Sequence, residues 1–254
     1  MMPEILEHIR KDVEELNFPA VFALIYTPAA LAANYYLKDP LVAEKLLKGT
    51  NLEWLGRLIA DPLPNNLPAL AYWVLIVTVT YFVIPAAFIK FVLKRRLRDF
   101  GLALSIEKGF WKLFAAVMAL MLPLTYLMST TAGFSAKYPF LHINDGSPYV
   151  GTTLLIWELI YFIQFFGLEF FFRGFLVHSL KPALGMYAIF AMTVPYCMIH
   201  FGKPPAETFA AIAAGIFLGW ISYKNGSIWL GLLLHCSVAF SMDILALYGK
   251  GLIF

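Results

Sequence analysis

The stretch GTTLLIWELIYFIQFFGLEFFFRGFLVH, residues 151–178, sets the fold class of this chain. It is long and apolar enough to cross a bilayer, whose hydrocarbon core is spanned by about 20 helical residues. Glu169 and Arg173 nevertheless lie in it one helical turn apart, a spacing at which a carboxylate and a guanidinium pair along one face. Charges at membrane depth cost roughly 2.5–3.5 kcal/mol each on insertion scales, so they face an interior or a water-filled cavity. The stretch predicts a membrane helix that carries either a structural ion pair or a polar site.

The composition of the whole chain agrees with a membrane protein. Of 254 residues, 61% are hydrophobic and only 14% are charged, and the mean hydropathy is +0.74. Soluble domains have about 45–50% apolar and 25% charged residues. We therefore predict an all-α, polytopic transmembrane bundle of about seven to eight helices. The seven expected spans are 18–36, 68–92, 110–130, 151–178, 184–200, 207–223 and 227–248.

We divide the chain into three parts. Residues 1–17 form a polar, amphipathic lead-in, residues 18–108 contain the first spans, and residues 109–254 form the core with the candidate site. Leucines at helical spacing between 38 and 66 predict a segment lying along the membrane interface. The cluster Lys94-Arg-Arg-Leu-Arg98 is expected in the cytoplasm by the positive-inside rule, which also places the N-terminus there.

Composition and spacing exclude some classes of protein and site. No basic face with interleaved aromatics lies outside the spans, so nucleic acid is not an expected partner. Cys197 and Cys236 both fall within predicted membrane helices, which argues against a disulfide framework. Ala211, Gly215 and Gly219 are four residues apart, and this pattern predicts close helix packing rather than chemistry.

Three neighbouring helices each contribute a titratable group to the candidate site. These groups are Glu169, His200 and His235, and Tyr196 lies one turn before His200. A carboxylate that takes a proton from water, with imidazoles that stabilise the attacked carbonyl oxygen, is one arrangement for hydrolysis. We therefore expect Glu169, His200 and His235 to be catalytic. The expected supporting residues are Arg173, Tyr196, Glu207 and Asp243, and Glu158 is expected to be an interfacial group or a partner of Glu169.

A metal site is a second possibility for the same three residues. Glu169, His200 and His235 could act as three protein ligands, with water as the fourth, which is a common arrangement in catalytic zinc sites. The chain lacks a His-Glu-x-x-His helix, so no cofactor is firmly implied.

The order of these motifs resembles the CAAX-protease and bacteriocin-processing (CPBP, or Abi) family of intramembrane proteases. The similar segments are Glu169-Phe-Phe-Phe-Arg173-Gly, Tyr196-x-x-x-His200 and His235, and the likeness extends from about 94 to 248. The family pattern is Glu-Glu-x-x-x-Arg, then Phe-x-x-x-His, then His-x-x-x-Asn/Asp. The resemblance implies a bacterial plasma-membrane endopeptidase that acts on a membrane-anchored protein or peptide.

The departures from the family pattern bear on activity. Leu168 occupies the position of the first glutamate, to which the water-activating role is usually given, and Ala239 occupies the position of the Asn or Asp. Asp243 lies one further turn along, about 12 Å from His235 at 1.5 Å per residue. A catalytically inactive relative that binds or shields a membrane protein, as in bacteriocin immunity, is therefore the main alternative.

Two further considerations remain from the sequence. A transporter or channel that uses the buried charges as an ion relay is a third reading, although the chain has no internal repeat.

Straight spans would place Glu169 and His200 about 10 Å apart in depth. Pro195 and the break at Gly202-Lys-Pro-Pro205 offer ways to close that gap.

Overall fold

The computed structural model of the chain describes residue 7 and residues 13–61, 67–104, 108–141 and 151–253. Most of the predicted lead-in at 1–17 lies outside these ranges. Within them the chain forms helices and an isolated bridge between Leu102 and Ser227, with no strand. The prediction of an all-α bundle is confirmed.

Six helices in the described ranges are long and apolar enough to cross a membrane. They agree with six of the expected spans, although the fourth extends past 178 to Leu184. The protein is therefore an integral membrane protein. The spans are α2 (Phe18–Leu37); Leu67–Val92, made of α5 (Leu67–Thr78), η1 (Val79–Val83), α6 (Ile84–Ala87) and η2 (Phe88–Val92); α7 (Phe110–Ser129); Thr152–Leu184, made of α9 (Thr152–Glu169), η4 (Phe170–Leu176) and α10 (Val177–Leu184); α12 (Pro205–Asn225); and α13 (Trp229–Gly249).

The span expected at 184–200 is shorter than predicted. It is α11 (Tyr187–Met198), 12 residues long, or about 18 Å, which is less than the roughly 30 Å hydrocarbon core. The preceding helix continues to Leu184, and the chain breaks at Gly185, whose φ is +55°. After α11 it turns again at Gly202, with φ +85°. His200 follows the end of α11 and is buried, with 8% of its surface exposed.

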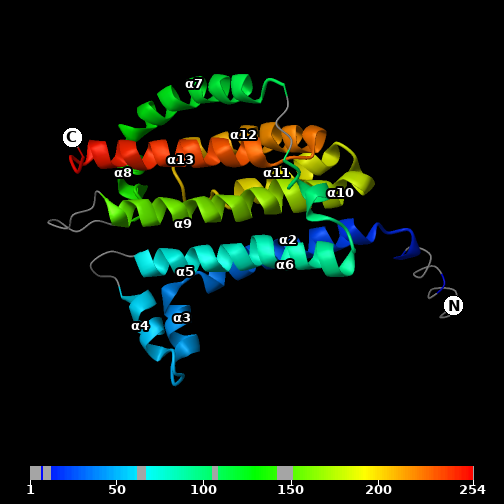
Figure 1. Cartoon of the computed structure of the whole chain (residues 1–254), viewed down its shortest axis with the longest axis horizontal. Helices are drawn as coiled ribbons and strands as arrows, with labels where there is room; N and C mark the ends of the chain where they lie inside the picture. Colours follow the sequence, from blue (N-terminus) through cyan, green and yellow to red (C-terminus); the bar gives the residue numbers. More distant parts are fainter. Residues whose placement is uncertain (1–6, 8–12, 62–66, 105–107, 142–150, 254) are drawn as a thin grey trace.

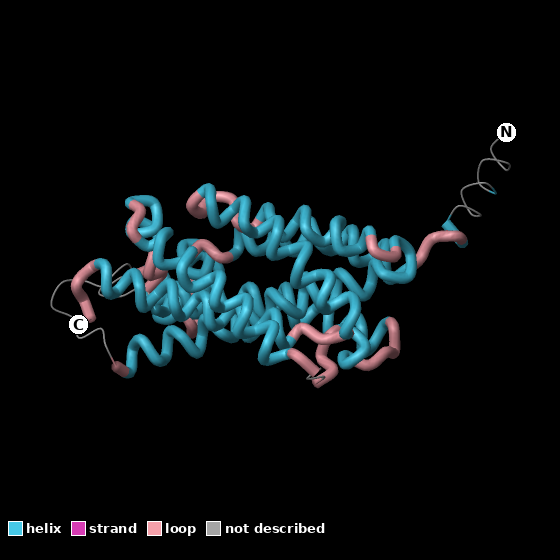
Figure 2. Tube along the Cα trace, turned by 90° about the horizontal axis from the view of Figure 1, so that it is seen from above, coloured by secondary structure: helices cyan, strands magenta, loops and turns pink. Residues whose placement is uncertain are grey.

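The long helices lie side by side in layers (Figures 1 and 2). α5 packs against α9, α9 against α13, and α13 against α7, while α11 packs closely on α12. The short helices α3 (Pro40–Leu47) and α4 (Glu53–Ala60) pack on each other and project from one end of the bundle (Figure 1). They cover much of the segment expected along the membrane interface. The remaining short elements are η3 (Leu97–Phe100) and α8 (Ala132–Lys137).

The phenylalanine run at 170–172 forms part of the protein core. All three rings are fully buried, and Phe171 stacks on Tyr81 with ring centroids 4.6 Å apart. The run begins η4, a π-helical segment, and such wide turns occur often at functional sites. The aromatic packing therefore holds the segment that carries Glu169 and Arg173 at the centre of the bundle.

The small residues of α12 pack against α11 as predicted. A Cβ atom at Gly215 would lie 3.0 Å from the Thr193 side chain and 3.1 Å from the Tyr196 ring. A Cβ at Gly219 would meet the end of Met192. Glycine at these positions lets the two backbones approach closely, which places Tyr196 deep in the bundle.

Candidate active site

Glu169 and His235 join α9 to α13 at the centre of the bundle. The Nδ1 atom of His235 lies 2.7 Å from Oε1 of Glu169, and Glu169 has no exposed surface. A carboxylate accepts, so Nδ1 of His235 carries a proton, and in the neutral imidazole Nε2 is then the acceptor. The buried carboxylate thus sets both the tautomer and the orientation of His235.

Arg173 balances the charge of Glu169. Its Nη1 atom lies 3.2 Å from Oε1 of Glu169, and the guanidinium is fully buried. The three guanidinium nitrogens make no well-aligned hydrogen bond among the described residues, and the group stacks on the Tyr196 ring, 3.7 Å from its centroid. The contacts of Arg173 are therefore a charge pair and a cation–π contact.

Gly231 makes room for the Glu169 carboxylate on α13. It lies one turn before His235, and a Cβ atom there would collide with Oε2 of Glu169. Only a residue without a side chain lets the carboxylate lie against the α13 backbone. The sequence showed Gly231 as an ordinary helix glycine, and only its neighbour in space gives it this role.

We expect Gly231→Ala to destabilise the protein by about 1–3 kcal/mol, because overpacking a filled interior forces side chains and backbone to shift. The displaced carboxylate would release His235. Thermal unfolding in detergent checks this, with Gly249→Ala on the same helix as the control, since a Cβ at Gly249 meets nothing within 4 Å. Equal melting temperatures for the two variants would contradict the packing role.

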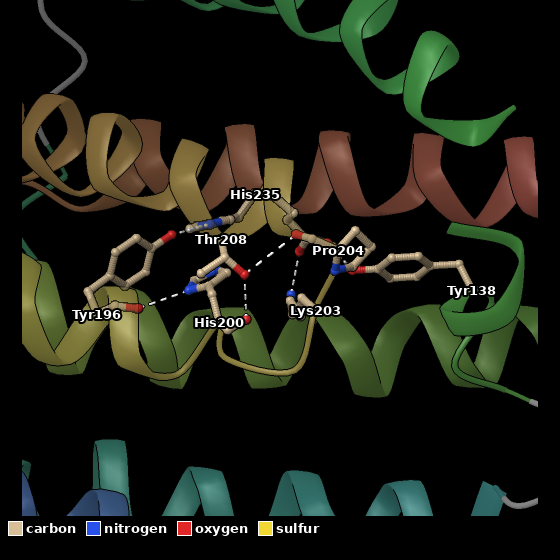
Figure 3. A network of polar contacts seen from close by, with 8 residues as sticks. Tyr138, Tyr196, His200, Lys203, Pro204, Thr208 and His235 are labelled. Atoms are coloured by element: carbon tan, nitrogen blue, oxygen red, sulfur yellow. Dashed lines mark hydrogen bonds and ion pairs between the residues drawn. The ribbon is translucent and has the colours of Figure 1, made fainter. Parts of the chain in front are cut away.

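Tyr196 and His200 continue the site from His235 (Figure 3). The Tyr196 hydroxyl lies 3.1 Å from Nε2 of His235 and donates to it, given the tautomer set by Glu169. Nδ1 of His200 lies 2.9 Å from the Tyr196 carbonyl oxygen, which can only accept. His200 therefore carries its proton on Nδ1, which leaves its Nε2 lone pair available. The expected gap in depth between Glu169 and His200 is bridged by His235 and Tyr196.

Beyond His200 a polar network continues through Thr208 and Lys203 towards Tyr138 (Figure 3). Thr208 donates to the His200 carbonyl at 2.9 Å, and Lys203 pairs with Glu207 at 2.6 Å. The Tyr138 hydroxyl donates to the other oxygen of Glu207 at 2.8 Å. Burial and the nearby Glu207 carboxylate raise the pKa of Tyr138, so this phenol stays a neutral donor. Glu207 thus lies near His200 but is already held by two partners.

A large cavity opens between the helices at this site. Its volume is about 1520 Å³, more than the roughly 300–1,000 Å³ typical of small-molecule pockets, and its lining includes Tyr196, His200 and His235. Leu168 and Ala239 also line it, whereas Glu169 does not. The next residue along the chain from Glu169 thus faces the cavity, while the carboxylate points between the helices.

Two acidic residues lie elsewhere. The Asp243 carboxylate is buried and accepts a hydrogen bond from Trp157 Nε1 at 2.8 Å. It contacts neither histidine of the site, so it does not stand in for the residue lost at Ala239. Glu158 in α9 is only 4% exposed and lies beside Asp243. The expectation that Glu158 is an interfacial group is therefore wrong.

Gln164 is a cavity residue that the expected site did not include. It lines the cavity one turn before Leu168, and its buried Oε1 has no partner among the described residues. Gln164 could have been recognised from the sequence because it lies four residues before Leu168, a spacing that puts both side chains on one face of α9. The side-chain amide can donate a hydrogen bond to a group in the cavity.

The described residues contain no group of three or more His, Cys, Asp and Glu that could hold a metal ion. Glu169 and His235 are in contact, but His200 directs Nδ1 to a backbone carbonyl. Cys197 and Cys236 are both free.

The part of the chain that contains the candidate site matches a known protein family. Residues 150–241 match the family described as "Type II CAAX prenyl endopeptidase Rce1-like". Over these residues the chain is similar to the CAAX-protease family. The matched part extends from the start of α9 into α13. It contains the five motif residues, which are Glu169, Arg173, Tyr196, His200 and His235. Comparisons with curated proteins and with solved structures gave no match.

The match to this family supports proteolysis within the membrane as a candidate activity. The positions at which our motif comparison expects a glutamate and an Asn or Asp hold Leu168 and Ala239, and both line the cavity. The chain thus keeps the two histidines and Arg173 while two cavity-facing positions are apolar.

Proposed function

We propose that this protein is an intramembrane endopeptidase that hydrolyses a peptide bond of a membrane-anchored protein or of a peptide leaving the membrane. The observation that carries the proposal is the chain of contacts from buried Glu169 through His235 and Tyr196 to His200, at the wall of the 1520 Å³ cavity. The cavity is large enough for a peptide segment and, being lined mainly by apolar side chains, suits a membrane-associated substrate.

In this proposal His200 is the general base. Its available Nε2 takes a proton from water, the water oxygen attacks the substrate carbonyl carbon, and the carbonyl becomes an oxyanion. The side-chain amide of Gln164 lines the cavity and can donate to this oxyanion. The C–N bond then breaks, and the leaving amine takes the proton back from His200.

Glu169 has a positioning role in this mechanism. The sequence suggested that Glu169 itself activates water, but its carboxylate is fully buried and does not line the cavity. It acts instead through His235, whose Nε2 holds the Tyr196 hydroxyl, and Arg173 pairs with the carboxylate. A cytoplasmic N-terminus and a bacterial plasma-membrane location remain part of the proposal.

The proposal is tested by comparing the termini of membrane proteins in host cells that carry either wild type or His200→Gln at matched abundance. We expect new cleaved termini with wild type and about 10²–10⁴-fold less of them with His200→Gln, the usual range for loss of a general base. The control is His178→Gln, since His178 in α10 faces Ser222 and does not line the cavity. Identical termini for wild type and His200→Gln would overturn the protease.

A second function is favoured by one specific observation. Leu168 and Ala239 make the cavity wall apolar where the family motif is polar, which suits a protein that binds a membrane peptide without cutting it. If the protein has this binding or immunity role, wild type and His200→Gln would protect cells from the membrane peptide equally well. Protection without any new termini would therefore select this second function.

A further inference from the structure

Two carboxyl groups lie together inside the bundle, away from the site described above. Glu158 on α9 and Asp243 on α13 are neighbours, with exposed fractions of 4% and 1%. Both oxygens of Glu158 and Oδ1 of Asp243 are buried without a hydrogen-bond donor among the described residues. The remaining oxygen, Oδ2 of Asp243, accepts from Trp157. Three unpaired carboxyl oxygens side by side need an explanation.

We propose that Glu158 and Asp243 share one proton. A protonated carboxyl group donates its O–H to the neighbouring carboxylate, which supplies the donor that the unpaired oxygens lack. Two ionised carboxylates side by side in a buried site would repel each other, and among the described residues no cation is paired with them. One proton between them leaves a single negative charge, which the Trp157 N–H stabilises.

The titratable groups around the pair do not remove the need for the proton. Tyr161 on α9, Tyr138 after α8 and Cys236 on α13 face it, and all three are neutral donors or thiols at ordinary pH. Glu207, on α12, lies further along the same cluster and is neutralised by Lys203. The charge of the pair is therefore decided by the pair itself.

An aromatic ladder connects this pair to His235. The Trp157 ring stacks on Tyr161 with centroids 4.7 Å apart, and Tyr161 contacts Phe165 at 4.5 Å. Phe165 in turn stacks on the His235 imidazole at 5.3 Å, with the two planes 9° apart. The rungs on α9 are four residues apart, so they form one face of the helix.

The pair and the ladder form a second clamp between α9 and α13. The first clamp is the contact of Glu169 with His235, and the second lies about 12 Å away, because Asp243 follows His235 by eight residues. The two antiparallel helices are thus held by polar contacts at two levels. The shared proton is a positioning device for His235, a consequence that rests on the proposed function.

The test measures protonation and stability directly in purified protein. Infrared difference spectra between wild type and Glu158→Gln, and between wild type and Asp243→Asn, should both show loss of a protonated carboxyl C=O band at neutral pH. The control, Glu53→Gln in α4, removes a partly exposed carboxylate paired with Arg57 and should lose only an ionised-carboxylate band. Absence of the protonated band from both differences would overturn the proposal.

The pH dependence of thermal unfolding is a second test of the shared proton, for use if one of the variants folds poorly. Wild type should lose several degrees of melting temperature as pH rises and the shared proton leaves, since two repelling carboxylates then remain. Glu158→Gln should lose this pH dependence, because an amide donates to Asp243 without titrating. An equal slope in wild type and Glu158→Gln would contradict the shared proton. Neither readout needs proteolysis, so failure of the proposed enzyme would be recognised separately.

If the protein is a protease, the pH profile of cleavage tests the positioning of His235. Glu158→Gln should retain cleavage at neutral pH and keep it at alkaline pH, where wild type declines. Glu158→Leu, which cannot donate to Asp243, should lose cleavage across the range. Equal profiles for wild type, Glu158→Gln and Glu158→Leu would show that the pair does not act on His235.

Discussion

Leu168→Glu is expected to raise proteolytic turnover by about 10²-fold, the lower end of what a positioned general base contributes. Leu168 lines the cavity together with both histidines of the site, whereas Glu169 lies behind them. A carboxylate at 168 would therefore reach water in the cavity, as Glu169 does not. In the family pattern Glu-Glu-x-x-x-Arg, the first glutamate corresponds to position 168 of this chain.

Cleavage of a membrane-anchored reporter by purified protein in vesicles measures this gain. Leu168→Gln is the matched control, because it has the size and polarity of glutamate but cannot accept a proton as a carboxylate does. Adding Ala239→Asn to Leu168→Glu should raise turnover further by restoring a second polar group to the cavity wall. Equal turnover of Leu168→Glu and Leu168→Gln would show that position 168 does not contact the reacting water.

Glu169→Gln is expected to show the largest loss. Removing one partner of a buried ion pair typically costs 3–5 kcal/mol, and here it leaves the fully buried Arg173 without its counter-charge. His235 also loses the carboxylate that sets its tautomer, which in hydrolases can cost up to about 10⁴-fold in turnover. Melting temperature and reporter cleavage should therefore both fall.

A double variant separates the two effects. Glu169→Gln with Arg173→Met removes the unbalanced charge, and replacement of a buried pair by apolar groups is often neutral for stability. We expect the melting temperature of the double variant to recover while cleavage stays low, since His235 still lacks the carboxylate that sets its tautomer. Recovery of cleavage together with stability would mean that Glu169 contributes only to folding.

The amino-acid sequence by itself determined the fold class and most of the spans. Runs of about 20 apolar residues have few alternatives to a membrane helix, because every backbone polar group must be satisfied within lipid. The expected spans at 18–36, 68–92 and 110–130 agree closely with α2, Leu67–Val92 and α7. The ordered motifs were also enough to indicate the protease family before the family match.

Only the tertiary structure decided the length of α11 and the place of His200. Continuation of the preceding helix to Leu184 depends on packing of the buried phenylalanines, and no local signal at 178 marks it. α11 ends at Met198, and the His200 that follows it is buried against the bundle.

The tertiary structure also decided which of two adjacent residues faces the cavity. Leu168 and Glu169 lie about 100° apart around their helix, as 3.6 residues per turn requires, but the sequence does not say where the cavity is. Nor does it show that Gly231 accommodates Glu169 or that Glu158 meets Asp243. These are contacts between α9 and α13, residues far apart in sequence, and they depend on how the two helices pack rather than on either helix alone.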